Sequence, residues 1–317
     1  MYLVAVKDFK SKALTDLSND IIKTLLYYDI FSYPLTLEEI YFSSSFEEIN
    51  KNEIENELNS IINLGIVFKH NNFFSLQENS EIAKRRIEGN KLAYKKIKTA
   101  KIFSKIISKF PFVRSVLLSG SLSKGYMDEK SDIDYFIITA PNKLWISRFS
   151  LMLFKKIFLF NSKKNFCINY FITTEKLKIE EKNVYIAVEL ATLIPTYGIE
   201  YYELLCSANK WVKEYFPNHP FKNKNGIKNF KKSLAQKIIE PLLNNNLGLF
   251  LDNFCMNLFY KYDKKKYSNY DEQSFNSSFK IKKNISTHHP CQFQNKVLLA
   301  LEQKIKLLQV EHNILIN

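Results

Sequence analysis

Two short stretches, Leu118-Ser119-Gly120-Ser121 and, ten residues later, Asp132-Ile133-Asp134, decide the fold of this chain. The first stretch ends an apolar run that is typical of a buried strand. Gly120 then allows a tight turn and a close approach of the backbone to a bound group. Ser121 opens a polar segment, where the amides of a helix N-terminus would face outward and attract an anion.

The two acidic residues predict a cation. Asp132 and Asp134 stand two residues apart, so on a second strand both side chains would leave the same face. Neighbouring carboxylates repel each other, and a divalent cation normally relieves that cost. An anion site beside a carboxylate pair is typical of metal-assisted phosphoryl transfer. A solvated loop with incidental acidic residues is the alternative interpretation.

Residues 120–125 (Gly-Ser-Leu-Ser-Lys-Gly) and 131–135 (Ser-Asp-Ile-Asp-Tyr) resemble the signature of the polymerase-beta-type nucleotidyltransferase superfamily. The resemblance extends from residue 101 to about residue 172. It implies an α+β fold in which helices flank a mixed sheet. The site that it implies has Gly120 and Ser121 on the nucleotide's β- and γ-phosphates, Lys124 as a supporting charge, and Asp132 and Asp134 as magnesium ligands.

Other candidate site residues lie on later elements. The family usually carries a third carboxylate on a later strand, which we expect at residues 166–172, and Asn169 occupies that position. An amide oxygen can bind magnesium, but it brings no charge and is no useful proton acceptor. Glu189, in the helical run 184–193, is a possible substitute acid or a plain surface glutamate. Arg148 is a candidate phosphate or base contact, with a structural salt bridge as the equal alternative.

The first eighty residues predict three helices and a hairpin. The first helix is expected at residues 17–28, and the second begins at a capping box of Thr36 and Glu39. The third helix is expected at residues 52–64, and a hairpin follows across residues 66–76. This order resembles a winged-helix domain, which often binds DNA. The third helix carries the glutamates Glu53, Glu55 and Glu57, which would repel phosphates. A packing or protein-interaction role is therefore favoured over DNA binding.

The remainder of the chain predicts a long basic helix and a helical C-terminal region. The basic helix is expected at residues 80–110, and an amphipathic helix at 149–160. Later helices are expected at 184–193, 201–216, 234–262 with kinks at Pro241 and Gly248, and 295–310. Residues 221–232 predict a basic loop and residues 264–286 a mobile loop. His288 and His289 are adjacent and point in different directions, so a metal site there is not expected.

The composition of the chain indicates the partners and the cellular location to expect. The chain has 317 residues, with 46 Lys and Arg against 32 Asp and Glu, a formal charge of +14. This charge suits phosphate-rich partners, although codon bias toward Lys explains it equally well. The four cysteines lack zinc-ligand spacing, the first eight residues lack a secretory pattern, and the sequence has no long apolar span. These features predict a cytoplasmic protein that does not cross a membrane.

Together these observations predict a magnesium-dependent nucleotidyltransferase. It would move a nucleoside monophosphate from an NTP, by default ATP, to an acceptor hydroxyl on a protein, an RNA or a small molecule. The alternative is a catalytically impaired member of the fold that senses a nucleotide, with a winged helix that docks a protein or DNA. The expected domains are residues 1–80 (winged-helix-like), 81–180 (catalytic) and 181–317 (helical).

Overall fold

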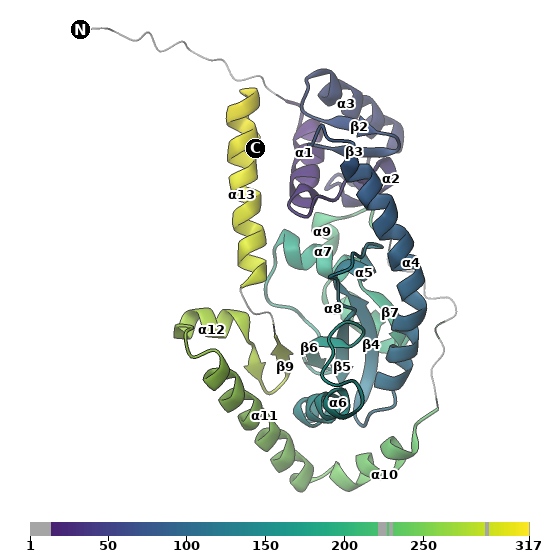
Figure 1. Ribbon diagram of the computed structural model, residues 1–317, viewed down its shortest axis with the longest axis vertical. Helices are drawn as coiled ribbons and strands as arrows, with labels where there is room; N and C mark the ends of the chain where they lie inside the picture. Colours follow the sequence, from purple (N-terminus) through teal and green to yellow (C-terminus); the bar gives the residue numbers. More distant parts are fainter. Residues whose placement is uncertain (1–13, 221–226, 228–230, 289–291, 317) are drawn as a thin grey trace, which may run out of the picture. The chain divides into compact units, whose positions relative to one another are not determined.

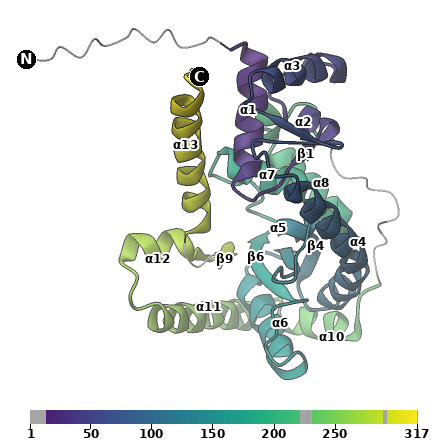
Figure 2. The ribbon, with the colours of Figure 1, turned by 45° about the horizontal axis from the view of Figure 1, so that its top comes forward.

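The structure, a computed structural model, describes residues 14–220, 227, 231–288 and 292–316 (Figures 1 and 2). These residues form two compact units. The first contains the described residues of Met1–Arg86, Lys213–Pro220 and Gln294–Asn317. The second contains those of Ile87–Val212 and Phe221–Phe293. Residues from far apart in the sequence therefore contribute to each unit.

The first unit is built from short helices and a small antiparallel sheet with the strand order β1-β3-β2. Local capping fixes where two helices begin. Thr36 and Glu39 form the expected capping box, and Asn50 and Glu53 form a second one. The elements are α1 (Asp16–Asp29), β1 (Leu35–Thr36), α2 (Leu37–Ser43), α3 (Lys51–Asn63), β2 (Phe68–His70), β3 (Phe73–Ser75) and most of α13 (Phe293–His312).

The expected helices and hairpin of this unit are confirmed. Ile21 and Leu25 of α1 and Ile54 and Leu58 of α3 are buried, as their helical spacing predicts. The carboxylate of Glu57 accepts hydrogen bonds from Thr15 and Ser18 at the start of α1. This glutamate therefore ties α3 to α1. The identity of these elements as a winged helix stays a prediction.

The second unit is built on a mixed sheet whose six described strands lie in the order β7-β4-β5-β6-β9-β8. Neighbours β5 and β6 are parallel, and the other neighbouring pairs are antiparallel. The strands are β4 (Val113–Ser119), β5 (Asp134–Thr139), β6 (Cys167–Thr173), β7 (Ile194–Tyr197), β8 (Ile281–Lys282) and β9 (Ile285–Thr287).

Helices cover both faces of this sheet. Val116 and Leu118 of β4 share a core with α4 (Glu81–Ile107) and α6 (Leu144–Phe158). Leu117, which points the other way, shares a second core with Tyr202 and Leu205 of α8 (Ile199–Ala208). Two apolar faces on one strand explain its continuous apolar sequence. The expected α+β fold with a mixed sheet flanked by helices is confirmed.

Residues 201–216 form two helices, α8 and α9 (Val212–Tyr215), rather than the single helix expected. The buried side chain of Asn209 separates them. Its amide nitrogen donates to the carbonyl oxygens of Leu177 and Leu205, both at 2.8 Å, and its oxygen accepts from the amide of Ile179 at 2.9 Å. These bonds hold the chain in a turn, because asparagine competes for backbone groups that a helix would use.

Residues 234–262 also divide into two helices, α10 (Leu234–Leu243) and α11 (Asn246–Lys266), instead of one kinked helix. Pro241 lies inside α10. The Asn245 side chain caps α11 by accepting from the amide of Gly248 at 3.1 Å. A Cβ on Gly248 would lie 1.7 Å from the carbonyl oxygen of Leu243. Glycine therefore permits a full break between the helices.

Residues 264–286, expected to be a mobile loop, are largely regular. They contain the end of α11, the helix α12 (Glu272–Ser278), β8 and most of β9. Phe275 and Phe279 are buried, and their rings lie 5.1 Å apart. Strand β9 pairs with β6 and so joins the main sheet. The polar composition misled the prediction, because the three-residue strand β9 gains its stability from pairing with the distant β6, and the two-residue strand β8 in turn pairs with β9.

Some expectations fall outside the described residues. They concern the first eight residues, most of the basic loop at 221–232, His289 and Cys291. Among the residues that the structure describes, no helix is both long and apolar enough to span a bilayer.

Candidate active site

The Gly-Ser turn and the second aspartate lie against each other because of strand register. Ser119, the last residue of β4, pairs with Asp134, the first residue of β5. Gly120 follows with φ +66°, and a Cβ at this position would lie 2.4 Å from Oδ2 of Asp134. Only glycine combines this backbone conformation with this close approach. The turn is therefore shaped around the carboxylate.

The short helix α5 (Gly120–Ser123) continues the turn. The hydroxyl of Ser123 donates to the carbonyl oxygen of Gly120 at 2.8 Å, which fixes the turn from inside. Ser121 is half-buried on the same turn. The ammonium of Lys124 donates to the carbonyl oxygen of Gly120 at 3.2 Å and so lies beside the turn, as expected. Gly120, Ser121 and Lys124 are therefore brought together with Asp134.

The carboxyl of Asp134 lies in a partly buried and negatively charged environment. Burial is the largest cause that raises its pKa to about 7, and the charges of Glu189 and Asp132 raise it further. A hydrogen bond from Cys167 and the charge of Lys124 act in the opposite direction. Asp132 lies two residues before Asp134, at the entrance to β5, rather than on the strand itself. Asp132 and Asp134 thus form the interacting carboxylate pair that their spacing predicts.

Asn169, which the sequence predicts at the position of the family's third acid, lies directly beside Asp134. Its amide Nδ2 donates to Oδ1 of Asp134 at 3.1 Å. The pairing of β5 with β6 jumps from Ile168 to Tyr170 between successive residues of β5, so Asn169 is the extra residue of a bulge. Such bulges re-aim a side chain. Here the bulge accompanies the contact of Asn169 with the carboxylate.

Glu189 is the acid that sequence reasoning placed least securely. It lies on α7 (Val184–Thr192), with its side chain 26% exposed, and pairs with Lys124 at 2.8 Å. Its charge raises the pKa of Asp134, so it belongs to the same cluster. The ion pair and the effect on Asp134 favour a place in this cluster over a plain surface glutamate. The two residues of the ion pair stand 65 positions apart, and only the packing of α7 brings them together.

Arg148 lies apart from the other candidate residues. It is buried on α6, where its Nη1 donates to the Ser286 hydroxyl at 2.7 Å. Its guanidinium lies 5.3 Å from the ring centre of Phe171 and 5.4 Å from that of Phe259. Burial lowers its pKa to about 10, which the charge of Asp263 opposes. These contacts favour the structural alternative over a phosphate contact.

Two residues of the site were missed from the sequence. Cys167 pairs opposite Asp134 in the β5–β6 ladder and donates a hydrogen bond to its carboxylate. Burial, followed by the charge of Asp134, raises the pKa of this thiol to about 12. Tyr185 of α7 lies nearby, since burial and the charges of Glu189 and Asp134 raise the pKa of its hydroxyl. No local sequence signal marks either residue, because strand register and helix packing place them.

The donor set can be compared with what magnesium requires. Asp132 and Asp134 supply hard oxygen ligands, and their mutual repulsion is of the kind that a bound cation relieves. Among the described residues, no group of three or more His, Cys, Asp and Glu side chains is arranged to hold a metal ion. The carboxylate pair offers oxygen ligands to a cation, whereas two ions held close together would need more negative ligands.

Comparison with known proteins agrees with this geometry. A family model described as a nucleotidyltransferase domain matches residues 99–219. No curated protein and no solved structure matches the chain. The matched segment includes the Gly120 turn, both aspartates, Asn169 and Glu189. Residues 99–219 of this chain are therefore similar to a nucleotidyltransferase domain.

Proposed function

We propose that this protein is a magnesium-dependent nucleotidyltransferase. It moves a nucleoside monophosphate from an NTP, by default ATP, to the hydroxyl group of an acceptor. The observation that carries this proposal is the close approach of the Gly120 turn to the Asp134 carboxylate. A Cβ added to Gly120 would lie only 2.4 Å from Oδ2 of Asp134. That contact joins a turn suited to phosphates with a carboxylate suited to a cation.

Each residue has a role in this proposal. Gly120 and Ser121 hold the β- and γ-phosphates, Lys124 adds positive charge, and Asp132 and Asp134 hold the cation. Magnesium, when bound, supplies charge compensation to the phosphates. Asn169 orients Asp134 through their hydrogen bond of 3.1 Å. Catalysis then comes from positioning and charge neutralisation, without a covalent intermediate.

The bonds that change define what the site must do. The acceptor oxygen forms a bond to the α-phosphorus, the bond between that phosphorus and the bridging oxygen to the β-phosphate breaks, and pyrophosphate leaves. The acceptor hydroxyl loses its proton. Asn169 cannot take that proton, because an amide is not a useful base. Glu189, a carboxylate of the same cluster, is assigned as the group that accepts it.

A second candidate function is a nucleotide-sensing module that has lost transfer activity. Asn169 favours it, because an amide stands where the family carries its third acid. In that case the first unit would dock a protein partner or DNA. The bonds from Thr15 and Ser18 to Glu57 give α3 a packing role and support the protein partner over DNA. In both functions the free thiols Cys167, Cys206 and Cys255 support a cytoplasmic location.

Calorimetric titration of ATP, with and without magnesium, tests the proposal. We expect magnesium-dependent binding that the Asp132→Ala variant loses, followed by incorporation of label from α-labelled NTPs into an acceptor. Absence of ATP binding under both conditions would reject the site. The Asn169→Asp variant separates the two functions: activity that appears only in this variant would identify the natural protein as a binding module.

A further inference from the structure

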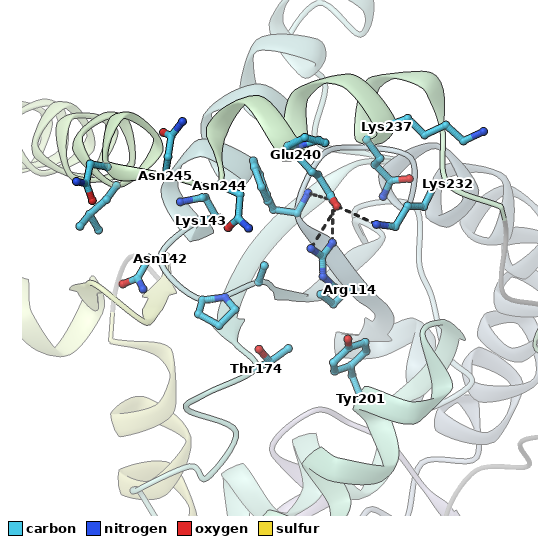
Figure 3. A pocket seen from close by; sticks show the side chains of 17 residues that line it. Arg114, Asn142, Lys143, Thr174, Tyr201, Lys232, Lys237, Glu240, Asn244 and Asn245 are labelled. Carbon is cyan, nitrogen blue, oxygen red and sulfur yellow. Dashed lines mark hydrogen bonds and ion pairs between the residues drawn. The ribbon is translucent and has the colours of Figure 1, made fainter.

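A cavity lies at the opposite end of β4 and β5 from the Gly120 turn. It has a volume of about 990 Å³ and is lined by residues at the start of β4, after the end of β5, and around the junction of α10 with α11. Figure 3 shows the side chains that line it, which come from these separate elements. The length of β4 separates the cavity from the candidate active site by about 20 Å, at roughly 3.3 Å per residue.

The lining of the cavity is positively charged. It contains four cations, Arg114, Lys143, Lys232 and Lys237, and one carboxylate, Glu240, which gives 4 − 1 = +3. The carboxylate is already engaged: it accepts from Arg114 at 2.8 Å, from Lys232 at 3.4 Å and from the amide of Phe112 at 2.7 Å (Figure 3). Glu240 therefore organises two of the cations and leaves an excess of positive charge for a ligand.

Lys143 is the feature that points to a ligand. It lines the cavity with only 5% of its surface exposed, and among the described residues its ammonium makes no hydrogen bond or ion pair. The ammonium nitrogen lies 5.7 Å from the ring centre of Phe112. A buried charge is costly unless it is paired. An anion in the cavity would provide the partner.

The acidic group near Lys143 does not fill that role. Oδ1 of Asp252 accepts from the amides of Trp145 at 2.8 Å and Ile146 at 2.9 Å. Its Oδ2 makes no hydrogen bond within the described part of the chain, so it is not bonded to Lys143. Burial lowers the pKa of Lys143, although the charge of Asp252 acts in the opposite direction. The ammonium thus stays undercompensated.

The neutral groups of the cavity indicate the body of the ligand. The first turn of α11, a helix of 21 residues, adds the positive end of a helix dipole at Asn246. Asn142, Asn244, Thr174 and Tyr201 contribute amide and hydroxyl groups. Such groups suit a hydroxylated molecule, because they can both donate and accept hydrogen bonds. The volume lies at the upper end of the range of about 300–1,000 Å³ for small-molecule sites.

We propose that this cavity binds a small phosphate-bearing ligand with a hydroxylated body, of the sugar-phosphate class. Lys143 holds the phosphate, Arg114 and Lys237 add positive charge to the lining, and the asparagine and hydroxyl side chains hold the remainder. The site is separate from the Gly120 turn and does not depend on the proposed transferase activity.

Calorimetric titration of ribose 5-phosphate into the full chain tests the proposal, with ribose as the uncharged comparison and inorganic phosphate as the bare anion. We expect ribose 5-phosphate to bind more tightly than phosphate, and ribose not to bind. Lys143→Met should weaken binding about tenfold or more, since a hydrogen bond to a charged group is worth roughly 1.5–3 kcal/mol. Lys237→Glu changes an exposed residue of the lining, so folding is preserved, and it should weaken binding several-fold.

Two controls make the test decisive. Lys261→Met removes an exposed lysine of α11 outside the cavity and should leave affinity unchanged. Asp132→Ala should also leave it unchanged; a loss there would place the ligand at the Gly120 turn and overturn the proposal. Equal affinity in the Lys143→Met, Lys237→Glu and Lys261→Met variants would overturn it too. Binding of a short RNA that depends on Lys143, without binding of ribose 5-phosphate, would also overturn the proposal.

Discussion

The amide of Asn169 donates a hydrogen bond of 3.1 Å to the carboxylate of Asp134. This relationship places an uncharged group where a third carboxylate would add to the repulsion around Asp134. The cluster keeps Asp132, Asp134 and Glu189, and Lys124 compensates part of their charge. The balance between these charges determines how tightly the site can hold a cation. Four predictions concern this balance and the core that surrounds the site.

Replacing Asn169 with aspartate should make the site depend on metal. The new carboxylate loses the hydrogen bond and adds a like charge beside Asp134, so the metal-free variant should unfold more easily by about 1–3 kcal/mol. Magnesium should restore its stability and bind more tightly than to the natural protein. Thermal unfolding with and without magnesium measures both effects. Asn161→Asp, at an exposed position, is the control and should show neither.

The stability of the metal-free protein should fall as pH rises toward neutrality. Because the pKa of Asp134 is raised from 3.8 to about 7, the folded protein binds a proton in that window that the unfolded chain has released. Stability then decreases with rising pH. Asp134→Asn removes this titration and should be more stable than the natural protein at about pH 8, by on the order of 3 kcal/mol, with the difference shrinking toward about pH 4.

Urea unfolding across this pH range, without divalent cations, measures that difference. A gap between the two proteins that stays constant with pH would show that Asp134 does not titrate in this window. Magnesium binding offers a second readout. It should strengthen as pH rises through about 7, because the cation competes with the proton for the same carboxylate.

Gly120→Ala should abolish ATP binding by disturbing the turn. Both the φ of +66° and the 2.4 Å approach of a Cβ to Asp134 act against alanine. Gly125→Ala is a matched control, because Gly125 has φ +74° but nothing lies within 4 Å of an added Cβ. Both variants should lose about 1 kcal/mol from the backbone term. Only Gly120→Ala should lose ATP in calorimetry, and equal binding by the two variants would contradict the assigned role of the turn.

Arg148→Met should affect stability rather than nucleotide binding. The change leaves the Ser286 hydroxyl without its donor and removes the guanidinium from between Phe171 and Phe259. We expect a loss of about 2–4 kcal/mol in the free energy of unfolding, measured with urea. ATP affinity, measured below the unfolding transition, should stay the same. A variant with normal stability and weakened ATP binding would instead support the phosphate contact first suggested by the sequence.

The sequence by itself determined the elements whose signals are local. The capping box of Thr36 and Glu39 marks the start of α2, and the spacing of apolar residues marks α1 and α3. The strand, glycine turn and second strand from residue 113 to residue 139 were also readable, because the motif specifies both its conformation and its acidic residues within one short segment. These features depend on interactions between residues a few positions apart, which sequence patterns record directly.

Tertiary structure alone decided what depends on register and on packing between distant segments. The β5–β6 pairing places Cys167 opposite Asp134 and the β6 bulge brings Asn169 beside it, while the packing of α7 brings Glu189 to Lys124. Strand β9 is held by its pairing with β6. The cavity at the start of β4 lies where α10 and α11 separate. No local pattern encodes these contacts, since their free energy arises only when residues far apart in the sequence meet.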